Sequence, residues 1–86
     1  MNLQDIEDAL VREVAVILDT QPDSVDAMRP LPDMGIDSMS FVELLVFIER
    51  TFCLKLIQSG LRKEDFHTLR ALAARIADEA QAERPT

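Results

Sequence analysis

The first stretch of the chain places apolar residues at the spacing of an α-helix. Leu3, Ile6, Leu10, Val14 and Ile17 follow one another at steps of three or four residues, which puts them on one face of a helix. The preceding Asn is a suitable N-cap, and acidic residues in the first turns suit the positive end of the helix dipole. We therefore predict an amphipathic helix over residues 3–19.

A long connection follows, and its composition excludes a regular helix. Pro22, Pro30 and Pro32 lack the backbone N–H that a helix interior needs, and Gly35 is a typical turn residue. Apolar residues are nevertheless spread through residues 20–37, so we expect the connection to pack on the core through Val25, Met28, Leu31, Met34 and Ile36. An ordered loop of this length in a small domain usually serves a function.

Further helices are predicted in the second half. The apolar stripe of residues 38–52 is wider than one core-facing side requires, so part of it should face a ligand or partner. After a short turn or helix around residues 61–66, Thr68 is placed to cap a last helix over residues 69–82. We expect the tail, residues 83–86, to be frayed. The residues expected on the inner face of the last helix are Leu69, Leu72, Ala73, Ile76 and Ala80. No strand or repeat is predicted.

Length and charge narrow the class of protein. A chain of 86 residues that is 48% apolar allows one small domain over residues 1–86. Sixteen acidic against nine basic residues give a net charge of −7, which argues against binding to nucleic acid or to an anionic membrane. Residues 1–37 hold nine of the acids and only two Arg, so a partner that meets this half should be basic. The chain has neither an apolar run of about 18 residues nor the order of a signal peptide, and we expect a cytoplasmic protein.

Groups for catalysis are scarce. The single Cys and single His leave no disulfide framework and no Cys-rich zinc site. Ser38, His67 and Asp37 form a hydrolytic triad only on paper, because the Asp is the sequence neighbour of the Ser and no Gly-x-Ser-x-Gly elbow is present. We expect His67 to be exposed ahead of the last helix and Cys53 to be a buried or half-buried thiol. Asp33 and Asp37 lack the spacing of a calcium-binding loop, so no metal site is predicted. No catalytic residue is predicted either.

The most informative segment is Asp33-Met34-Gly35-Ile36-Asp37-Ser38-Met39. Its Gly permits a tight turn, and Asp37 and Ser38 stand where a loop becomes a helix. In a structural interpretation one of these two residues caps the helix, with Ser40 and Glu43 as a rival capping box. In a functional interpretation a phosphate esterified to the Ser38 hydroxyl lies among free N–H groups at the helix N-terminus, and Asp37 helps to hold a divalent cation. The residues alone leave both interpretations open.

The same segment resembles the phosphopantetheine attachment site of the acyl carrier protein family. The family pattern is Gly-hydrophobic-Asp-Ser-Leu/Met, followed by a helix that carries Val-Glu-Leu and closes in Glu-x-x-Phe. Here Gly35-Ile36-Asp37-Ser38-Met39 is followed at matching spacing by Val42-Glu43-Leu44 and Glu49-Arg50-Thr51-Phe52. The resemblance covers nearly the whole chain, and it implies an all-α, four-helix bundle with three main helices and one short one.

The resemblance also implies a function. Such a protein is not an enzyme: it carries an acyl or aminoacyl group as a thioester on a 4′-phosphopantetheine arm attached to Ser38, with Asp37 in a supporting role. The arm supplies the reactive thiol, and Cys53 does not. The implied partners are a phosphopantetheinyl transferase, a loading ligase or synthase, and downstream transferases. The protein is expected to be a monomer. Its flexible tether raises the local concentration of cargo at each partner's active site. The alternative is an unmodified helical adaptor that docks a partner helix.

Helical spacing places Met39, Glu43, Val46 and Arg50 on one face. In related carriers this is the face on which modifying enzymes dock, and we expect the same here. The alternative for Met39 and Val46 is that both are core residues, because the helix is so apolar.

Departures from the family pattern bear on cargo. Cys53 stands where the family commonly has Gly, and Arg50 and Thr51 stand where fatty-acid carriers have acids. Residues 60–68 resemble the third-helix region of small free-standing carriers, including D-alanyl and other aminoacyl carriers, and Phe66 is expected to plug the core between the second and last helices. Basic residues accompany this region, namely Lys55, Arg62 and Lys63. Our hypothesis is a specialised carrier that a separate adenylate-forming ligase loads with an amino acid or small acid, with long-chain and polyketide cargo as alternatives.

Overall fold

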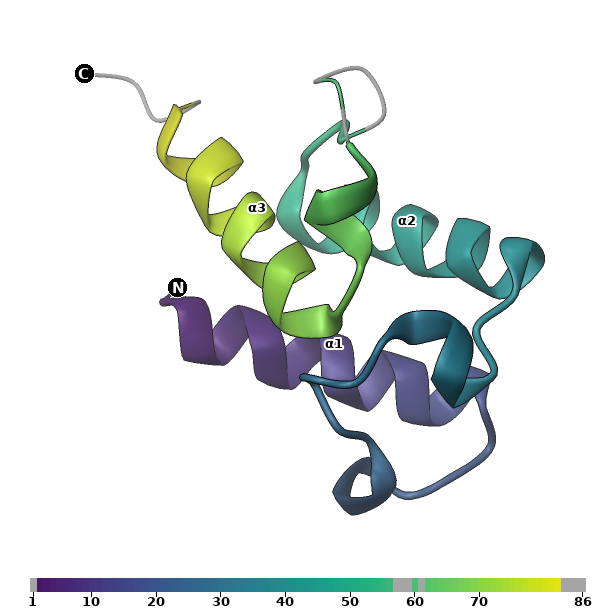
Figure 1. The fold of residues 1–86 in the computed structure, drawn as a ribbon. Helices are drawn as coiled ribbons and strands as arrows, with labels where there is room; N and C mark the ends of the chain where they lie inside the picture. The colour runs from purple at the N-terminus through teal and green to yellow at the C-terminus, as the bar shows by residue number, and fades with distance from the viewer. Residues whose placement is uncertain (1, 57–59, 61, 83–86) are drawn as a thin grey trace.

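The computed structural model describes residues 2–56, 60 and 62–82, and within these it contains helices and no strand (Figure 1). Three α-helices are joined by short 3-10 helices in the order α1 (Leu3–Ile17), η1 (Pro22–Ser24), η2 (Leu31–Met34), α2 (Ser38–Phe52), η3 (Lys63–Phe66) and α3 (Leu69–Ala82). The all-α prediction is confirmed, and the short member of the bundle is the 3-10 helix η3. The predicted frayed tail, residues 83–86, and Leu61 lie outside the described residues.

The start of α1 is fixed by the predicted cap. The Asn2 side chain accepts a hydrogen bond from the Asp5 amide at 2.8 Å, and the Asp5 carboxylate accepts from the Asn2 amide at 3.5 Å. This reciprocal pair satisfies two amides that a helix start otherwise leaves open. At the other end the helix stops at Ile17, two residues earlier than predicted, and Asp19 adopts a positive φ of 55°.

The connection between α1 and α2 packs on the core as expected, with one exception. Leu31 and Ile36 are buried, and Val25 and Met34 are partly buried against the same cluster. Met28, in contrast, is 63% exposed, so the prediction was wrong for this residue. Its amide donates to Asp26 Oδ1 at 2.9 Å in a tight surface turn, which leaves its side chain outside.

The core lies where α1 meets the other two helices, because α1 packs against both α3 and α2. Burying a large apolar side chain contributes about 1.5–3 kcal/mol to stability. Ala80 was predicted on the inner face of α3 but is exposed, since the last turns of α3 rise away from α1 (Figure 1). The largest fully buried side chains are Val14 and Leu10 of α1, Leu44 and Ile48 of α2, Leu56, and Leu69, Leu72 and Ile76 of α3.

Two ion-pair clusters fix the position of α3. Arg70 makes a two-pronged contact with Glu7 of α1, at 2.9 and 3.3 Å, and Glu7 is only 7% exposed. Arg75 of α3 contacts Asp65 of η3 at 2.7 Å, and it also contacts Glu79 at 3.0 Å. These contacts hold α3 to α1 and η3 to α3, so η3 has a defined place beside the bundle.

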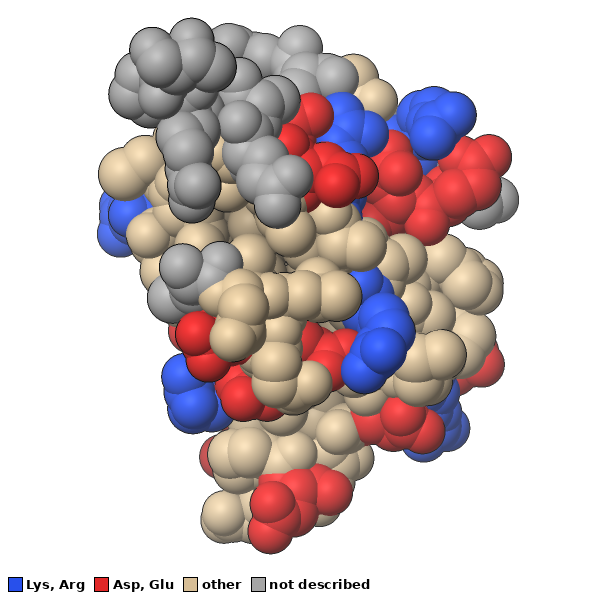
Figure 2. All heavy atoms as spheres, turned by 90° about the vertical axis from the view of Figure 1, so that its left-hand side faces the viewer, with Lys and Arg blue, Asp and Glu red and all other residues tan. Residues whose placement is uncertain are grey.

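One face of the molecule shows how its charged side chains are distributed. On the face that Figure 2 shows, acidic and basic side chains are interspersed among uncharged ones, and the described atoms form no broad basic area there. In the described part of the chain no helix combines the length and the apolar character that a bilayer span requires.

Candidate functional site

The segment before the site turns at a glycine in the left-handed backbone conformation. Gly35 closes η2 with φ +95°, and the amide of Ile36 returns to the Leu31 carbonyl at 3.2 Å. A side chain at such a φ costs roughly 1–2 kcal/mol, which explains the Gly at this turn. Ile36 then enters the core at 6% exposure, so Asp37 and Ser38 follow a firmly anchored residue.

Asp37 caps α2. Its Oδ1 accepts the Ser40 amide at 2.9 Å, and its carbonyl accepts the Phe41 amide at 2.9 Å. The hydrogen bond from the Ser40 amide, above all other causes, holds the pKa of the Asp37 carboxyl below its ordinary value. The rival capping box of Ser40 and Glu43 does not form the helix start, because Ser40 already lies inside the helix.

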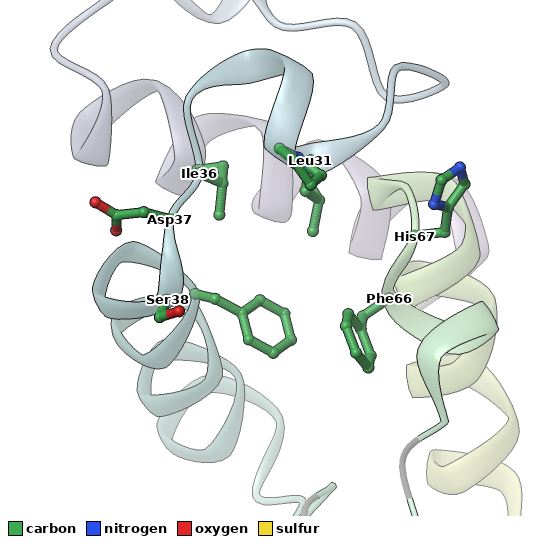
Figure 3. Close-up of a pocket in the computed structure, with 8 residues that line it drawn as sticks. Leu31, Ile36, Asp37, Ser38, Phe66 and His67 are labelled. Carbon is green, nitrogen blue, oxygen red and sulfur yellow. The ribbon is translucent and has the colours of Figure 1, made fainter.

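Ser38 is the first residue of α2, and it is exposed. Within the described residues no hydrogen bond engages its side chain, since Asp37 does the capping. Figure 3 shows its hydroxyl at the start of the helix, beside a hollow of the surface. The site therefore presents an uncommitted alcohol at the positive end of a 15-residue helix.

That hollow is a groove of about 220 Å³ between α2 and the junction of η3 with α3 (Figure 3). The rings of Phe41 and Phe66 meet across it, with centroids 4.9 Å apart and planes at 37°. The amide of Leu31 donates to the His67 carbonyl at 3.0 Å, which ties η2 to the far side of the groove. The groove is lined by Leu31, Pro32, Ile36, Asp37, Ser38, Phe41, Phe66 and His67.

The hydrolytic triad does not assemble. His67 is exposed, as predicted, and lies across the groove from Ser38 (Figure 3). The Asp37 carboxylate is hydrogen-bonded to the Ser40 amide rather than to the imidazole. Among the described residues no group of three or more His, Cys, Asp or Glu side chains is arranged to hold a metal ion.

Cys53 is exposed, so the prediction of a buried or half-buried thiol was wrong. It follows α2 as its C-cap with φ 57° and ψ 39°, a left-handed conformation that turns the chain out of the helix. This conformation explains why a glycine suits the position, since glycine reaches it without a steric cost.

The predicted partner face lies at the surface of α2. Met39 is 77% and Val46 41% exposed, so neither is a core residue. Glu43 and Arg50 are also exposed, and helical spacing puts all four on one side. Lys55 and Arg62 are exposed as well, whereas the side chain of Lys63 lies outside the described atoms.

The sequence predicted core packing for several residues that line the groove, but it did not predict the groove. Leu31 and Ile36 were predicted to pack on the core, and they do. Phe66 was expected to plug the core, and it instead packs against the core from a half-buried position in the groove wall. No spacing rule pairs Phe41 with Phe66, because they come from different elements that only the tertiary fold brings together.

The chain matches a known protein family. The family model described as the phosphopantetheine attachment site matches residues 8–76, which is most of the chain. The matched range includes α2, the groove and Ser38. No curated protein matches the chain.

Proposed function

We propose that Ser38 carries the prosthetic arm of this chain, which belongs to the phosphopantetheine-attachment-site family of carrier proteins. Members of this family are carriers without catalytic activity of their own, and their arm is a covalently attached 4′-phosphopantetheine. A phosphopantetheinyl transferase adds this arm, and partner enzymes then use it.

The observation that carries the proposal is the uncommitted, exposed hydroxyl of Ser38 at the start of α2. In the transfer from coenzyme A, the Ser38 oxygen bonds to the phosphorus that bears the pantetheine half. The bond from this phosphorus to the adenosine bisphosphate half breaks, that half leaves with the electron pair, and the hydroxyl proton passes to a base of the transferase or to solvent. The new phosphodiester lies at the helix N-terminus, where the helix dipole favours a negative charge.

Asp37 supports the attachment in this proposal. The pKa of its carboxyl lies below the ordinary value of 3.8, so the group is ionised at neutral pH. The bond to the Ser40 amide uses Oδ1, and a carboxylate keeps further acceptor sites for a cation. We assign it the role of helping to hold the Mg²⁺ that accompanies coenzyme A on the transferase.

Partner enzymes dock on the face of α2 formed by Met39, Glu43, Val46 and Arg50. The exposure of the two apolar members supports this assignment, because exposed apolar residues clustered on a helix commonly mark an interaction surface. Val42, 56% exposed, extends the apolar surface. Glu43 adds a negative charge that a basic partner would meet, so the association should depend on salt.

For cargo, we propose an amino acid or small acid loaded in trans by a separate ATP-dependent, adenylate-forming ligase. The support is the resemblance of residues 60–68 to small free-standing carriers, aminoacyl carriers among them, together with the exposed Lys55 and Arg62 as contacts for an acidic partner. The proposal places the chain in fatty acid, polyketide or nonribosomal peptide biosynthesis. The single domain, the monomeric state and the cytoplasmic location stay predictions.

Intact-mass analysis tests the proposal. The protein is incubated with coenzyme A, Mg²⁺ and a phosphopantetheinyl transferase, and we expect a gain of one arm, located on the peptide that contains Ser38. An unmodified adaptor would gain nothing. Capture of the loaded protein from its native host, followed by weighing of the thioester, then identifies the cargo.

A further inference from the structure

The exposed side of α2 combines apolar and charged residues. Met39, Val42 and Val46 are all exposed, and helical spacing places them on one side of the helix. Glu43 and Arg50 are exposed on the same side. Clustered apolar residues at the surface, accompanied by polar ones, are typical of a site where another molecule binds.

The two charges of this side are not neutralised within the helix. Glu43 and Arg50 are seven residues apart, which is about 10.5 Å along the axis at 1.5 Å per residue, whereas side chains of one helix meet at spacings of three or four residues. Among the described residues neither side chain takes part in an ion pair. Each charge is therefore available to a group on another molecule.

The order of these residues makes this side of α2 complementary to itself. Glu43 lies three residues before Val46, and Arg50 lies four residues after it. In an antiparallel pair of α2 helices with a two-fold axis beside Val46, Glu43 of each copy meets Arg50 of the other. Such a contact uses the same patch on both copies, so each ion pair is made twice. A parallel pair would instead set Glu43 against Glu43 and Arg50 against Arg50.

Charges beyond the two ends of this surface have the same order. Asp37 is exposed just before α2, and Lys55 is exposed just after it. An antiparallel pair brings the start of one α2 to the end of the other, so an acidic end meets a basic end twice. One side of a 15-residue helix is smaller than the roughly 800 Å² that each partner buries in a standard interface, so the pairing is weak and depends on protein concentration.

We infer that two copies of this chain pair antiparallel about a two-fold axis through the α2 surface formed by Met39, Val42, Glu43, Val46 and Arg50. The consequence for regulation rests on the proposed function, because the same surface is proposed to receive partner enzymes. Pairing covers that surface, so the paired carrier is closed to the transferase. The monomer, which predominates in dilute solution, is the form that partner enzymes use.

Sedimentation equilibrium over a series of protein concentrations, in reducing buffer, tests the pairing. We expect the average mass of the wild type to rise from that of one chain toward that of two, and added salt to reverse the rise. Glu43→Lys and Arg50→Glu should each weaken pairing several-fold, because like charges then meet. A wild type that stays a single chain up to its highest soluble concentration would overturn the inference.

The charge exchange distinguishes a second copy from any other occupant. In the double variant Glu43→Lys/Arg50→Glu each new charge again meets its opposite on the other copy, so pairing should return to about the wild-type strength. No such recovery is expected for a contact with a different protein, whose charges stay unchanged. A double variant that pairs no better than the single variants would contradict the antiparallel arrangement.

Disulfide trapping tests the position of the axis. In a Cys53→Ser background, Val46→Cys puts two thiols beside the axis, so oxidation with copper-phenanthroline should link the copies rapidly. Val16→Cys is the matched control, because Val16 is an exposed valine of α1 rather than of α2. It should form the linked dimer at least several-fold more slowly. Equal rates for the two variants would contradict the arrangement.

Arm attachment to the trapped protein separates this inference from the proposed function. The Val46→Cys dimer and its reduced form are incubated with coenzyme A, Mg²⁺ and a phosphopantetheinyl transferase, and we expect the dimer to gain the arm several-fold more slowly. Equal rates would contradict the closure of the docking surface. A wild type that pairs but gains no arm contradicts the proposed function alone, whereas one that gains the arm but never pairs contradicts this inference alone.

Discussion

The carboxylate of Asp37 accepts the Ser40 amide at 2.9 Å, so the residue before Ser38 caps α2 and leaves the Ser38 hydroxyl to solvent. Two adjacent residues thus divide two tasks. Asp37 stabilises the helix start, and Ser38 is available for modification. Substitutions at the two positions should therefore affect different measurements.

The substitution Asp37→Asn should separate the helix-capping role of this side chain from the role of its negative charge. Asn caps helices about as well as Asp, so thermal unfolding should change little, whereas Asp37→Ala should cost about 0.5–2 kcal/mol. Loss of the carboxylate removes a cation ligand beside the reacting phosphate, so we expect slower arm attachment to Asp37→Asn in a timed intact-mass assay. Attachment at the wild-type rate would contradict the supporting role of Asp37.

Stability should fall in acid through Asp37 and Asp65. The pKa of each carboxyl lies below the ordinary value of 3.8, chiefly because a backbone amide donates to it, that of Ser40 to Asp37 and that of Arg62 to Asp65. As the pH falls, the two carboxyls therefore bind protons in the unfolded chain before they do so in the folded protein. Their contribution to the free energy of unfolding is complete well above pH 3.8. It is lost as the pH falls through their folded-state pKa values. Urea unfolding at a series of pH values should show a shallower acid loss for Asp37→Asn than for the wild type. Identical pH profiles would contradict this assignment.

Cys53→Gly should stabilise the protein. Cys53 adopts a left-handed conformation with φ 57° and is exposed, so glycine relieves backbone strain without loss of packing, for a gain on the order of 1 kcal/mol. Cys53→Ala is the control, because Ala keeps the strain. Urea unfolding checks the order of the two variants, and a Gly variant no more stable than the Ala variant would be the contrary result.

Glu43→Lys should weaken association with the transferase. The side chain is exposed on the proposed docking face, and reversal of its charge replaces an attraction for a basic partner with repulsion. Added salt should weaken the wild-type complex as well. Asp78→Lys makes a similar charge reversal on exposed α3 surface and should have a smaller effect. Salt-independent binding that Glu43→Lys leaves unchanged would count against this face.

Local signals in the sequence predicted the helices and their caps well. The Asn2 cap, the start of α2 at Ser38 and the Thr68 cap, whose hydroxyl accepts the Ala71 amide at 3.1 Å, were all visible as short-range patterns. Each depends on residues within one turn of one another, where propensity and hydrogen-bonding rules apply directly.

Those patterns left several other relationships undecided. The sequence left open whether Asp37 or Ser38 caps α2, because either side chain suits the position, and the structure assigns the cap to Asp37. The contact between Phe41 and Phe66 depends on how η3 settles against α2. The exposure of Met28 and Cys53 follows from local turns whose direction composition does not encode.

The most direct test of the central claim is arm attachment to three proteins compared side by side. The wild type, Ser38→Ala and Ser40→Ala are each incubated with coenzyme A, Mg²⁺ and a phosphopantetheinyl transferase and then weighed intact. Ser40 is the matched control, being a second serine in the first turn of α2. We predict one arm on the wild type and on Ser40→Ala, and none on Ser38→Ala, which should still fold. An arm on the Ser38→Ala protein would contradict the assignment of Ser38 as the attachment residue.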